Sequence, residues 1–324
     1  MSIVIPYYNM HTYIDDTLRS VNESYYRNWE VIMVDDGSPS IEAQEKFIAI
    51  EQAYCGNPQY QFLRKPNGGL GSARNFGIRQ SSGKYILPLD SDDVIHPQYI
   101  NLAVQALERQ KDLAAVSCYV SYFNDGSSFN QIIDYVIPYD LNPLLITLED
   151  RAGVACSVFR KEVFDRFQYN EELSAFEDWE LWWQMAEAGL KSETMPIILY
   201  RYRLRKNSMF HQTSPIEAAH LKYRISDLHS HYIIQVGVDV FRIYVAALAQ
   251  KFLMEQQLRT QISNGSSGSL EIDQIYLELQ TIKNSFSWKI IEKLRNLWLY
   301  HWMHPIYMRL KRVITTLNKS RKNM

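Results

Sequence analysis

Residues 84–93, KYILPLDSDD, pass from an apolar run into a tetrad of polar residues. The apolar half predicts a buried strand over 84–89. In an extended segment residues two apart point to the same side, so Asp90 and Asp92 can face one ligand. Carboxylate pairs that leave other positions to water and phosphate suit Mg²⁺ or Mn²⁺. The tetrad alone also fits a solvated acidic turn or a helix cap, but its place at a strand end favours binding.

Upstream of this stretch the chain alternates between short apolar runs and segments of helical periodicity. Strands are expected over 2–6, 29–34 and 60–63, and helices over 12–21, 41–53 and 71–80. This alternation predicts an α/β fold with a Rossmann-like, mostly parallel sheet flanked by helices. In such sheets the ligand binds at the carboxyl ends of the strands.

Downstream the pattern is less regular. The expected elements are strands over 114–123 and 197–202 and a helix over 179–188. From residue 218 the chain reads as mostly helical, with a flexible turn or linker, NGSSG, at 264–268. We therefore expect a first domain over 1–217 and a mostly helical C-terminal extension over 218–324.

The net charge of −2 hides an asymmetry between the two parts. From Lys283 onward there are ten Lys or Arg residues and one acid, a balance of +9, so the rest of the chain carries −11. No nucleic-acid partner is expected for such an acidic body, whereas the basic tail favours an anionic partner or surface.

The cysteines and the apolar segments indicate the cellular compartment of the protein. The 3 Cys residues are widely spaced and form no CxxC or metal-ligand pattern, so a reducing cytoplasm is expected. The N-terminus does not resemble a secretory signal. The longest apolar candidate for a membrane span, 236–249, is interrupted by Asp239 and Arg242.

Polar residues also follow the second and third predicted strands. Asp35 and Asp36 begin a turn signature, DDGS; at a nucleotide site, an aspartate there can instead accept from a base N–H or a ribose hydroxyl. The glycine-rich segment 67–75 fails the dinucleotide fingerprint, since Arg74 stands at the third glycine position. Its backbone N–H groups and Arg74 can still bind phosphate, and the alternative is a glycine-rich turn with a surface arginine.

Glu177 and Asp178 open the predicted helix that continues through 179–188. Acids in a first helical turn are favoured by the helix dipole, which is the simpler interpretation. The functional interpretation is a general base that lies over the sheet edge, opposite a metal ion.

Five short blocks occur in a fixed order along the chain. They are IVIPYYN at 3–9, VDDGS at 34–38, NGGLGSARN at 67–75 with Gly77, GKYILPLDSDD at 83–93, and FEDW at 176–179. Together they resemble the inverting family 2 glycosyltransferases, which have the GT-A fold, of the bacterial surface-polysaccharide type. The resemblance covers about residues 2–215.

The resemblance implies roles for individual residues. Contacts with the sugar donor are implied for Pro6, Tyr7, Asp35 or Asp36, Asn67, Arg74, Asp90, Ser91 and Arg205. Asp90-Ser91-Asp92 matches the DxD motif, in which the last acid ligates Mn²⁺ or Mg²⁺ and Asp90 lies nearby. Asp178 matches the acid that deprotonates the acceptor hydroxyl.

One position departs from the family pattern. Many members carry a histidine that helps to hold metal or diphosphate where this chain has Arg205. A guanidinium cannot ligate a cation, although it can clamp phosphate. The nearby His211 is interpreted as an ordinary loop histidine.

The activity implied is transfer of a hexosyl or N-acetylhexosaminyl group from a nucleotide-diphosphate sugar, with UDP expected, to a glycan or lipid-linked acceptor. The alternatives are a nucleotidyltransferase and a nucleotide-sugar binding module without catalysis. A nucleotidyltransferase requires a glycine-rich segment directly after the first strand, which this sequence lacks. Intact Asp90, Asp92 and Asp178 argue against an inactive module.

The basic tail carries Trp288, Trp298 and Trp302 among its lysines and arginines. Similar Ser-x-Ser-Trp-Lys segments occur at the ends of bacterial surface-polysaccharide glycosyltransferases. Aromatic residues mixed with basic ones suit an interfacial helix on anionic lipid, so 286–322 is a candidate for peripheral contact with the inner membrane. The alternative is a helix packed on the catalytic domain.

Overall fold

The computed structural model describes residues 1–124, 133–143, 145–147, 154–205 and 213–236. The chain divides into two units, Met1–Ile233 and Ile234–Met324. The predicted boundary after residue 217 falls within a helix of the first unit, α8 (Pro215–Leu228). The predicted extension beyond Val236 lies outside the described residues, so the division into two domains stays a prediction.

The first part of the chain alternates between strands and helices as expected. The elements are β1 (Ser2–Tyr7), α1 (Ile14–Asn22), β2 (Glu30–Asp35), α2 (Ile41–Ala53), β3 (Tyr60–Arg64), α3 (Leu70–Gln80) and β4 (Tyr85–Pro88). Each lies within about two residues of its predicted bounds. The residue before α1 is Tyr13, which makes no side-chain capping bond, so α1 begins two residues after the predicted start at 12.

The second part was only partly predicted. Its elements are β5 (Val94–Ile95), α4 (Tyr99–Arg109), β6 (Leu113–Asn124), β7 (Asp134–Val136), the 3₁₀ helix η1 (Leu145–Thr147), β8 (Val158–Arg160), α5 (Lys161–Phe164), α6 (Glu177–Glu187) and β9 (Lys191–Leu204). β6 and α6 match the predicted strand and helix closely. β9 begins six residues before its predicted start, at 191 instead of 197.

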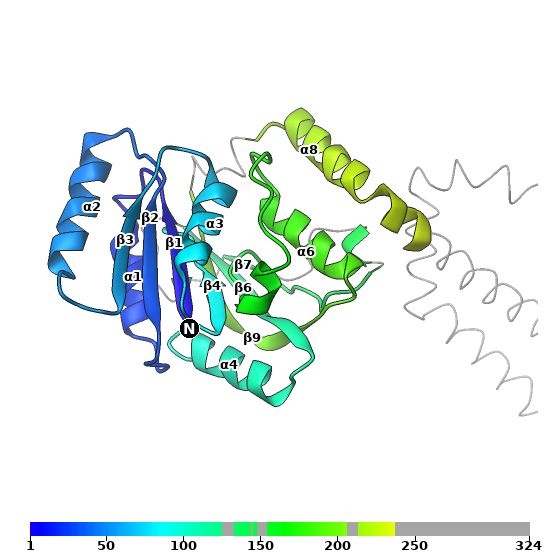
Figure 1. Cartoon of the computed structure of the whole chain (residues 1–324), viewed down its shortest axis with the longest axis horizontal. Coiled ribbons are helices and arrows are strands. Elements are labelled where there is room, and N and C mark those ends of the chain that lie inside the picture. Colours follow the sequence, from blue (N-terminus) through cyan, green and yellow to red (C-terminus); the bar gives the residue numbers. More distant parts are fainter. Residues whose placement is uncertain (125–132, 144, 148–153, 206–212, 237–324) are drawn as a thin grey trace, which may run out of the picture. The chain divides into compact units, whose positions relative to one another are not determined.

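The described strands form one sheet in the order β3-β2-β1-β4-β8-β6-β9-β5, with β7 paired to β6. β1, β2, β3 and β4 run parallel to one another, whereas β8 is antiparallel to both β4 and β6. Figure 1 shows these first strands side by side with helices around them. The predicted sheet flanked by helices is confirmed.

The two faces of the parallel strands are covered by different helices. Ile3, Ile5 and Tyr7 of β1 belong to a core that also contains residues of α1, α2 and α4. The alternate residue Val4 faces α3, where a Cβ added to Gly77 would lie 2.5 Å from Val4 Cγ1 and 3.0 Å from Val34 Cγ2. Because successive strand residues point to opposite faces, one run of apolar residues supplies both cores. The close approach at Gly77 brings α3 against the sheet.

Candidate functional site

Three parallel strands end level with one another where the sequence places its polar residues. In the sheet register Tyr7 lies beside Asp35, and Asp35 lies beside Arg64. The loops that follow are joined by backbone bonds: Asp36 N donates to the Tyr7 carbonyl at 2.9 Å, and Lys65 N donates to the Asp35 carbonyl at 3.0 Å. These loops therefore meet at one edge of the sheet.

Asp36 holds the glycine-rich loop in place. Its side chain is 3% exposed and accepts from Lys65 Nζ at 2.6 Å and from Gly69 N at 2.8 Å. At the next residue, Gly37, φ is +71° and a Cβ would lie 2.8 Å from Asn67 N, so the two loops can approach this closely because the residue is glycine. The Asp36 carboxylate is thus hydrogen-bonded within the protein, to the backbone of the glycine-rich loop and to Lys65.

Asp35 lies at a hollow of about 660 Å³ next to this loop. The hollow is lined by Asp35, Gly37, Ser38, Pro39, Gln44, Phe47, Ile48, Arg64, Lys65 and Pro66. Its volume is within the range of about 300–1,000 Å³ that is usual for small-molecule sites. Asp35 Oδ1 accepts from Ser38 N at 3.0 Å. The two acids that the sequence left as alternatives therefore differ, since Asp35 borders the hollow and Asp36 supports its wall.

The other residues expected to contact a donor lie at different depths. Pro6 and Ser91 are buried, and Asn67 is exposed. Tyr7 is fully buried; its hydroxyl donates to the Ala43 carbonyl at 2.8 Å and its ring packs on Phe47. The Tyr7 side chain is thus part of the core under α2.

Arg74 is the most deeply buried cation of the site, with 1% of its side chain exposed. Its Nη2 donates to Asp90 Oδ1 at 2.7 Å and its Nη1 donates to Glu177 Oε1 at 2.5 Å. The guanidinium also lies over the ring of Tyr169, 5.2 Å from its centroid. The structure therefore makes Arg74 a bridge between the DxD segment and the first turn of α6, and the alternative of a surface arginine is wrong.

Burial and these ion pairs shift the pKa values of the acidic residues around Arg74. Burial raises the pKa of Glu177 to about 7, against the lowering effect of Arg74. Burial likewise raises the pKa of Asp178, again opposed by Arg74. Asp178 is half-buried and one of its oxygens accepts from Trp179 N at 2.9 Å. A carboxylate whose proton affinity is raised in this way is better suited to accept a proton near neutral pH.

The backbone is strained next to this acid pair. Phe176, the residue before α6, has φ +63° and ψ +20°. In the described part of the chain the other residue besides glycine with positive φ is Asn9, at +55°, in the loop after β1. Such a conformation costs about 1–3 kcal/mol and occurs where the surrounding structure fixes it. Both residues flank the edge at which the acids gather.

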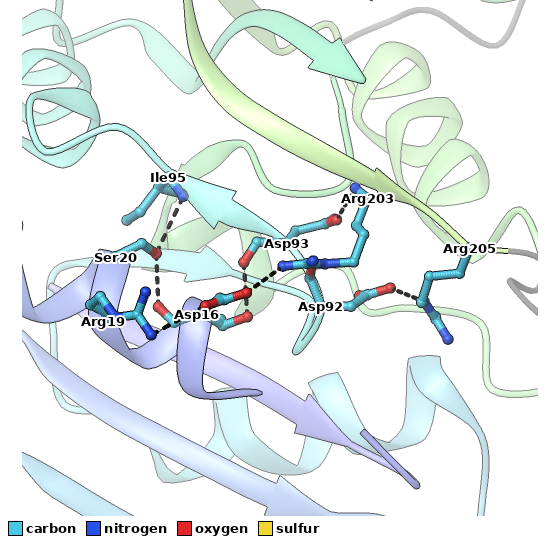
Figure 2. A network of polar contacts seen from close by, with 9 residues as sticks. Asp16, Arg19, Ser20, Asp92, Asp93, Ile95, Arg203 and Arg205 are labelled. Carbon is cyan, nitrogen blue, oxygen red and sulfur yellow. Dashed lines mark hydrogen bonds and ion pairs between the residues drawn. The ribbon is translucent and has the colours of Figure 1, made fainter. Parts of the chain in front are cut away.

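Asp92 is paired with Arg205. Arg205 Nε donates to Asp92 Oδ2 at 2.5 Å, and the two side chains are 15% and 11% exposed. Figure 2 shows the pair, with Arg205 reaching Asp92 from the end of β9. Burial raises the pKa of Asp92, and the charge of Arg205 lowers it. The DxD acid and the residue at the aligned histidine position are therefore in direct contact.

A second arginine of β9 fixes the backbone around Asp92. Arg203 Nε donates to the Asp92 carbonyl at 2.7 Å and Arg203 Nη2 donates to Asp16 Oδ2 at 2.9 Å. Asp93 accepts from Arg203 N at 2.8 Å and from the Tyr200 hydroxyl. Figure 2 shows the Arg203 side chain directed toward Asp16, with Asp92 and Asp93 beside it. The loop that carries the DxD acids is thus anchored to both α1 and β9.

The donor set fits a divalent cation that shares its coordination with a ligand. No cluster of three or more His, Cys, Asp or Glu residues suited to a metal occurs among the described residues. Mg²⁺ is commonly held by one or two carboxylates with substrate phosphates and water. Asp90 and Asp92 are such a pair. Asp90 Oδ1 accepts from Arg74, and Asp92 Oδ2 accepts from Arg205. His211 lies outside the described residues.

Four important residues were not singled out as site residues from the sequence. Lys65, Glu177 and Arg203 each bind one of the predicted residues, and Asp93 binds Arg203. Glu177 stood in a quoted motif, and Arg203 lies near the end of β9, two residues before Arg205. The partners of these residues are distant in sequence, so no local pattern could identify them.

The fold matches a solved structure whose ligand is known. S. aureus TarS 1-349 in complex with UDP-GlcNAc gives a TM-score of 0.56 at 20% sequence identity, over 72% of this chain and 66% of that one. At this identity the likeness establishes the fold alone, and it confirms the predicted GT-A class.

Two curated relatives are similar in sequence. An uncharacterized glycosyltransferase of Rickettsia conorii is 31% identical over 191 residues, which is 57% of this chain and 31% of the relative. The chondroitin synthase of Escherichia coli is 28% identical over 193 residues, which is 58% of this chain and 27% of the relative. The chain thus spans about a third or less of the length of these relatives.

The family follows from the sequence match that accompanies this fold. The model of glycosyl transferase family 2 matches residues 2–167, just over half of the 324 residues. The chain belongs to glycosyl transferase family 2, and the part of the predicted resemblance that names a family 2 glycosyltransferase is confirmed.

We expect Arg74→Met to lower the free energy of unfolding by about 3–5 kcal/mol, because it leaves two carboxylates without their buried cation. Urea denaturation measures this loss. Lys191→Met is the matched control, since Lys191 pairs with Asp112 at 2.8 Å while both side chains are more than half exposed. Loss of an exposed pair costs about 0–1 kcal/mol. Equal losses in the two variants would contradict the structural role of Arg74.

Proposed function

We propose that this protein transfers a hexosyl or N-acetylhexosaminyl group from a nucleotide-diphosphate sugar to a hydroxyl of a glycan or lipid-linked acceptor, in the cytoplasm and with inversion. The observation that carries the proposal is the bridge formed by Arg74. It holds Asp90 of the DxD motif and Glu177, the neighbour of Asp178, on one guanidinium. This contact supports a site in which Asp90 lies on the donor side and Asp178, next to Glu177, is the base.

The expected donor is a UDP-sugar. The hollow beside Asp35 has a size that suits a nucleoside, and it combines a carboxylate with the apolar side chains of Phe47 and Ile48. TarS was solved with UDP-GlcNAc, and the shared fold supports a donor of the same chemical class. In this proposal Pro6, Tyr7, Asn67 and either Asp35 or Asp36 form the nucleotide side of the site, with Asp35 favoured by its position.

The diphosphate would lie near Asp90, Ser91 and Asp92. Mn²⁺ or Mg²⁺, held by Asp92 with Asp90 nearby, would neutralise charge on the departing diphosphate, and such Lewis-acid assistance contributes several kcal/mol. Arg205 is placed to donate to phosphate oxygens, because its guanidinium already reaches Asp92. In this proposal Arg74 fixes the position of Asp90, because its guanidinium donates to the Asp90 carboxylate.

Asp178 is the proposed general base. It is half-buried at the start of α6, and its pKa is raised by burial. Unlike its neighbour Glu177, it forms no ion pair with a described residue. A direct displacement with inversion requires one carboxylate on the acceptor side to take the proton of the attacking hydroxyl. Asp178 is therefore the better candidate of the two acids.

Two other functions remain as alternatives in this proposal. A nucleotidyltransferase would also use carboxylates with Mg²⁺, but membership of glycosyl transferase family 2 favours sugar transfer. A binding module without catalysis would not require Asp178. The E. coli relative is a chondroitin synthase, which supports a glycan as the acceptor class here.

The tail is proposed as a membrane contact. Its residues 286–322 lie outside the described part of the chain, and the proposal depends on their basic and aromatic composition. Among the helices that the structure describes, none is long and apolar enough to cross a membrane. Peripheral binding to an anionic inner membrane surface would bring the enzyme to a lipid-linked acceptor.

Incubation with a panel of nucleotide-sugars and Mn²⁺ tests the function directly. We expect one donor, with UDP as its nucleotide, to yield free nucleoside diphosphate by slow hydrolysis, and faster when an acceptor is present. Chromatography of the nucleotides measures this product. A parallel incubation with nucleoside triphosphates and sugar 1-phosphates tests the alternative enzyme, because a nucleotidyltransferase would join these two substrates and release pyrophosphate. Binding of a nucleotide-sugar without either product would show a module that lacks catalysis.

We expect Asp178→Asn to lower kcat by about 10²–10⁴-fold, because general-base assistance is lost. Donor affinity should change little, since Asp178 acts on the acceptor. Initial rates and donor titrations separate the two effects, and NMR of the product gives its anomeric configuration. Asp165→Asn, at an exposed acid after α5, is the control and should retain full activity. A product with retained configuration would contradict the displacement mechanism.

We expect the full chain to sediment with anionic vesicles at low salt and a chain ending at Thr281 to stay in the supernatant. Each basic residue near such a surface contributes about 1 kcal/mol, and Trp288, Trp298 and Trp302 would add to this. Because the Debye length is only about 8 Å at physiological ionic strength, added salt should weaken binding steeply. Neutral vesicles are the control. If both chains stay in the supernatant, the tail does not bind membranes.

A further inference from the structure

The contact between Arg205 and Asp92 joins two groups to which the proposed function gives separate ligands. Asp92 is the proposed metal ligand, and Arg205 is the proposed diphosphate contact. In the structure they bind each other, with Nε and Oδ2 2.5 Å apart. Metal bound at Asp92 and the guanidinium therefore compete for the same carboxylate.

The surroundings of the pair allow Arg205 to change partners while Asp92 stays in place. Arg203 fixes the Asp92 carbonyl from behind, and its own backbone N–H is bound by Asp93. The Arg203 side chain is 7% exposed, whereas that of Arg205 is 15% exposed. Figure 2 shows the guanidinium of Arg205 with its Nε edge toward Asp92 and its far end directed away from the acid. The Arg205 guanidinium also lies over the ring of Tyr13, 5.5 Å from its centroid, so opening the ion pair changes this contact while Arg203 continues to hold Asp92.

Electrostatics makes this exchange depend on the diphosphate. A divalent cation that binds Asp92 alone either displaces Arg205 from the carboxylate or lies beside its guanidinium, and in both cases two positive charges are brought close together. A diphosphate changes this balance, because its oxygens accept from the guanidinium and also coordinate the cation. Each ligand thus removes an unfavourable charge that the other would create.

We propose that Arg205 is a placeholder cation: it neutralises Asp92 before the metal binds and moves to the donor diphosphate when Asp92 binds the metal, so metal and nucleotide bind cooperatively. This inference rests on the proposed function. Linkage requires the nucleotide to strengthen metal binding by the same factor by which the metal strengthens nucleotide binding. The exchange would also keep free metal from occupying Asp92 before the donor arrives.

The test is a titration of the full chain with Mn²⁺, with and without UDP, followed by the electron paramagnetic resonance of free Mn²⁺ and by calorimetry. For the natural sequence we expect weak binding of Mn²⁺ alone and binding about 5–150-fold tighter with UDP, the usual range of coupling between sites. Arg205→Gln should bind Mn²⁺ alone more tightly by a factor in the same range. In this variant, the factor by which UDP tightens Mn²⁺ binding should be smaller than in the natural sequence.

Two variants serve as matched comparisons. Arg109→Gln removes the same charge from an exposed arginine, 68% exposed and paired with Glu193, and should leave Mn²⁺ binding unchanged. Arg205→Lys keeps the charge and should restore weak binding of Mn²⁺ alone. It also provides the test if Arg205→Gln fails to fold, because tight binding of Mn²⁺ alone by Arg205→Lys would contradict the placeholder role.

The outcomes distinguish this inference from the proposed function. If Arg205→Gln binds Mn²⁺ alone no more tightly than the natural sequence, Arg205 is not a placeholder, whatever the nucleotide does. If the natural sequence binds UDP equally well with and without Mn²⁺, the coupling is absent and the inference is wrong. If no nucleotide binds to any variant under any condition, the proposed function itself fails, and the Mn²⁺ comparison still decides the role of Arg205 at Asp92.

Discussion

The site depends on one buried guanidinium. Arg74 lies between Asp90 at 2.7 Å and Glu177 at 2.5 Å, and 1% of its side chain is exposed. A charge so far from water is tolerated only when its partners are fixed in good geometry. In turn, Arg74 fixes the positions of its two partners, because the DxD loop and the start of α6 are held by the same cation. The strained backbone at Phe176 lies directly before Glu177, the α6 residue that Arg74 holds.

Pairing of acids with basic side chains recurs at this edge. Lys65 binds Asp36, Arg205 binds Asp92, and Arg203 binds Asp16. In the structure these carboxylates are therefore neutralised by the chain itself. Under the proposed function, binding of an anionic donor and a cation would exchange ion partners, which costs less than removing separate charges from water.

The helices and strands of the first part were predictable because each is set by local periodicity. α2 has the bounds that its apolar spacing indicated, and α3 differs by one residue. α4 also carries apolar residues at helical spacing, so its signal was present in the sequence although no helix was assigned there. β8 has only three residues, too few for a periodic pattern. The first residues of β9 are extended because they pair with β6, and the register of this pairing shifts along the strands. Such pairings are tertiary, and no local pattern encodes them.

By itself the sequence determined the α/β class, the family and the positions at which acidic residues follow strands, because those features depend on periodicity and on short motifs. Tertiary structure decided what each charged residue does. It separated Asp35 at the hollow from Asp36 in the loop wall, and it placed Arg74 in the interior. The physical reason is that the energy of a buried charge depends on partners distant in sequence: Glu177 is 103 residues from Arg74, and Asp92 is 113 residues from Arg205.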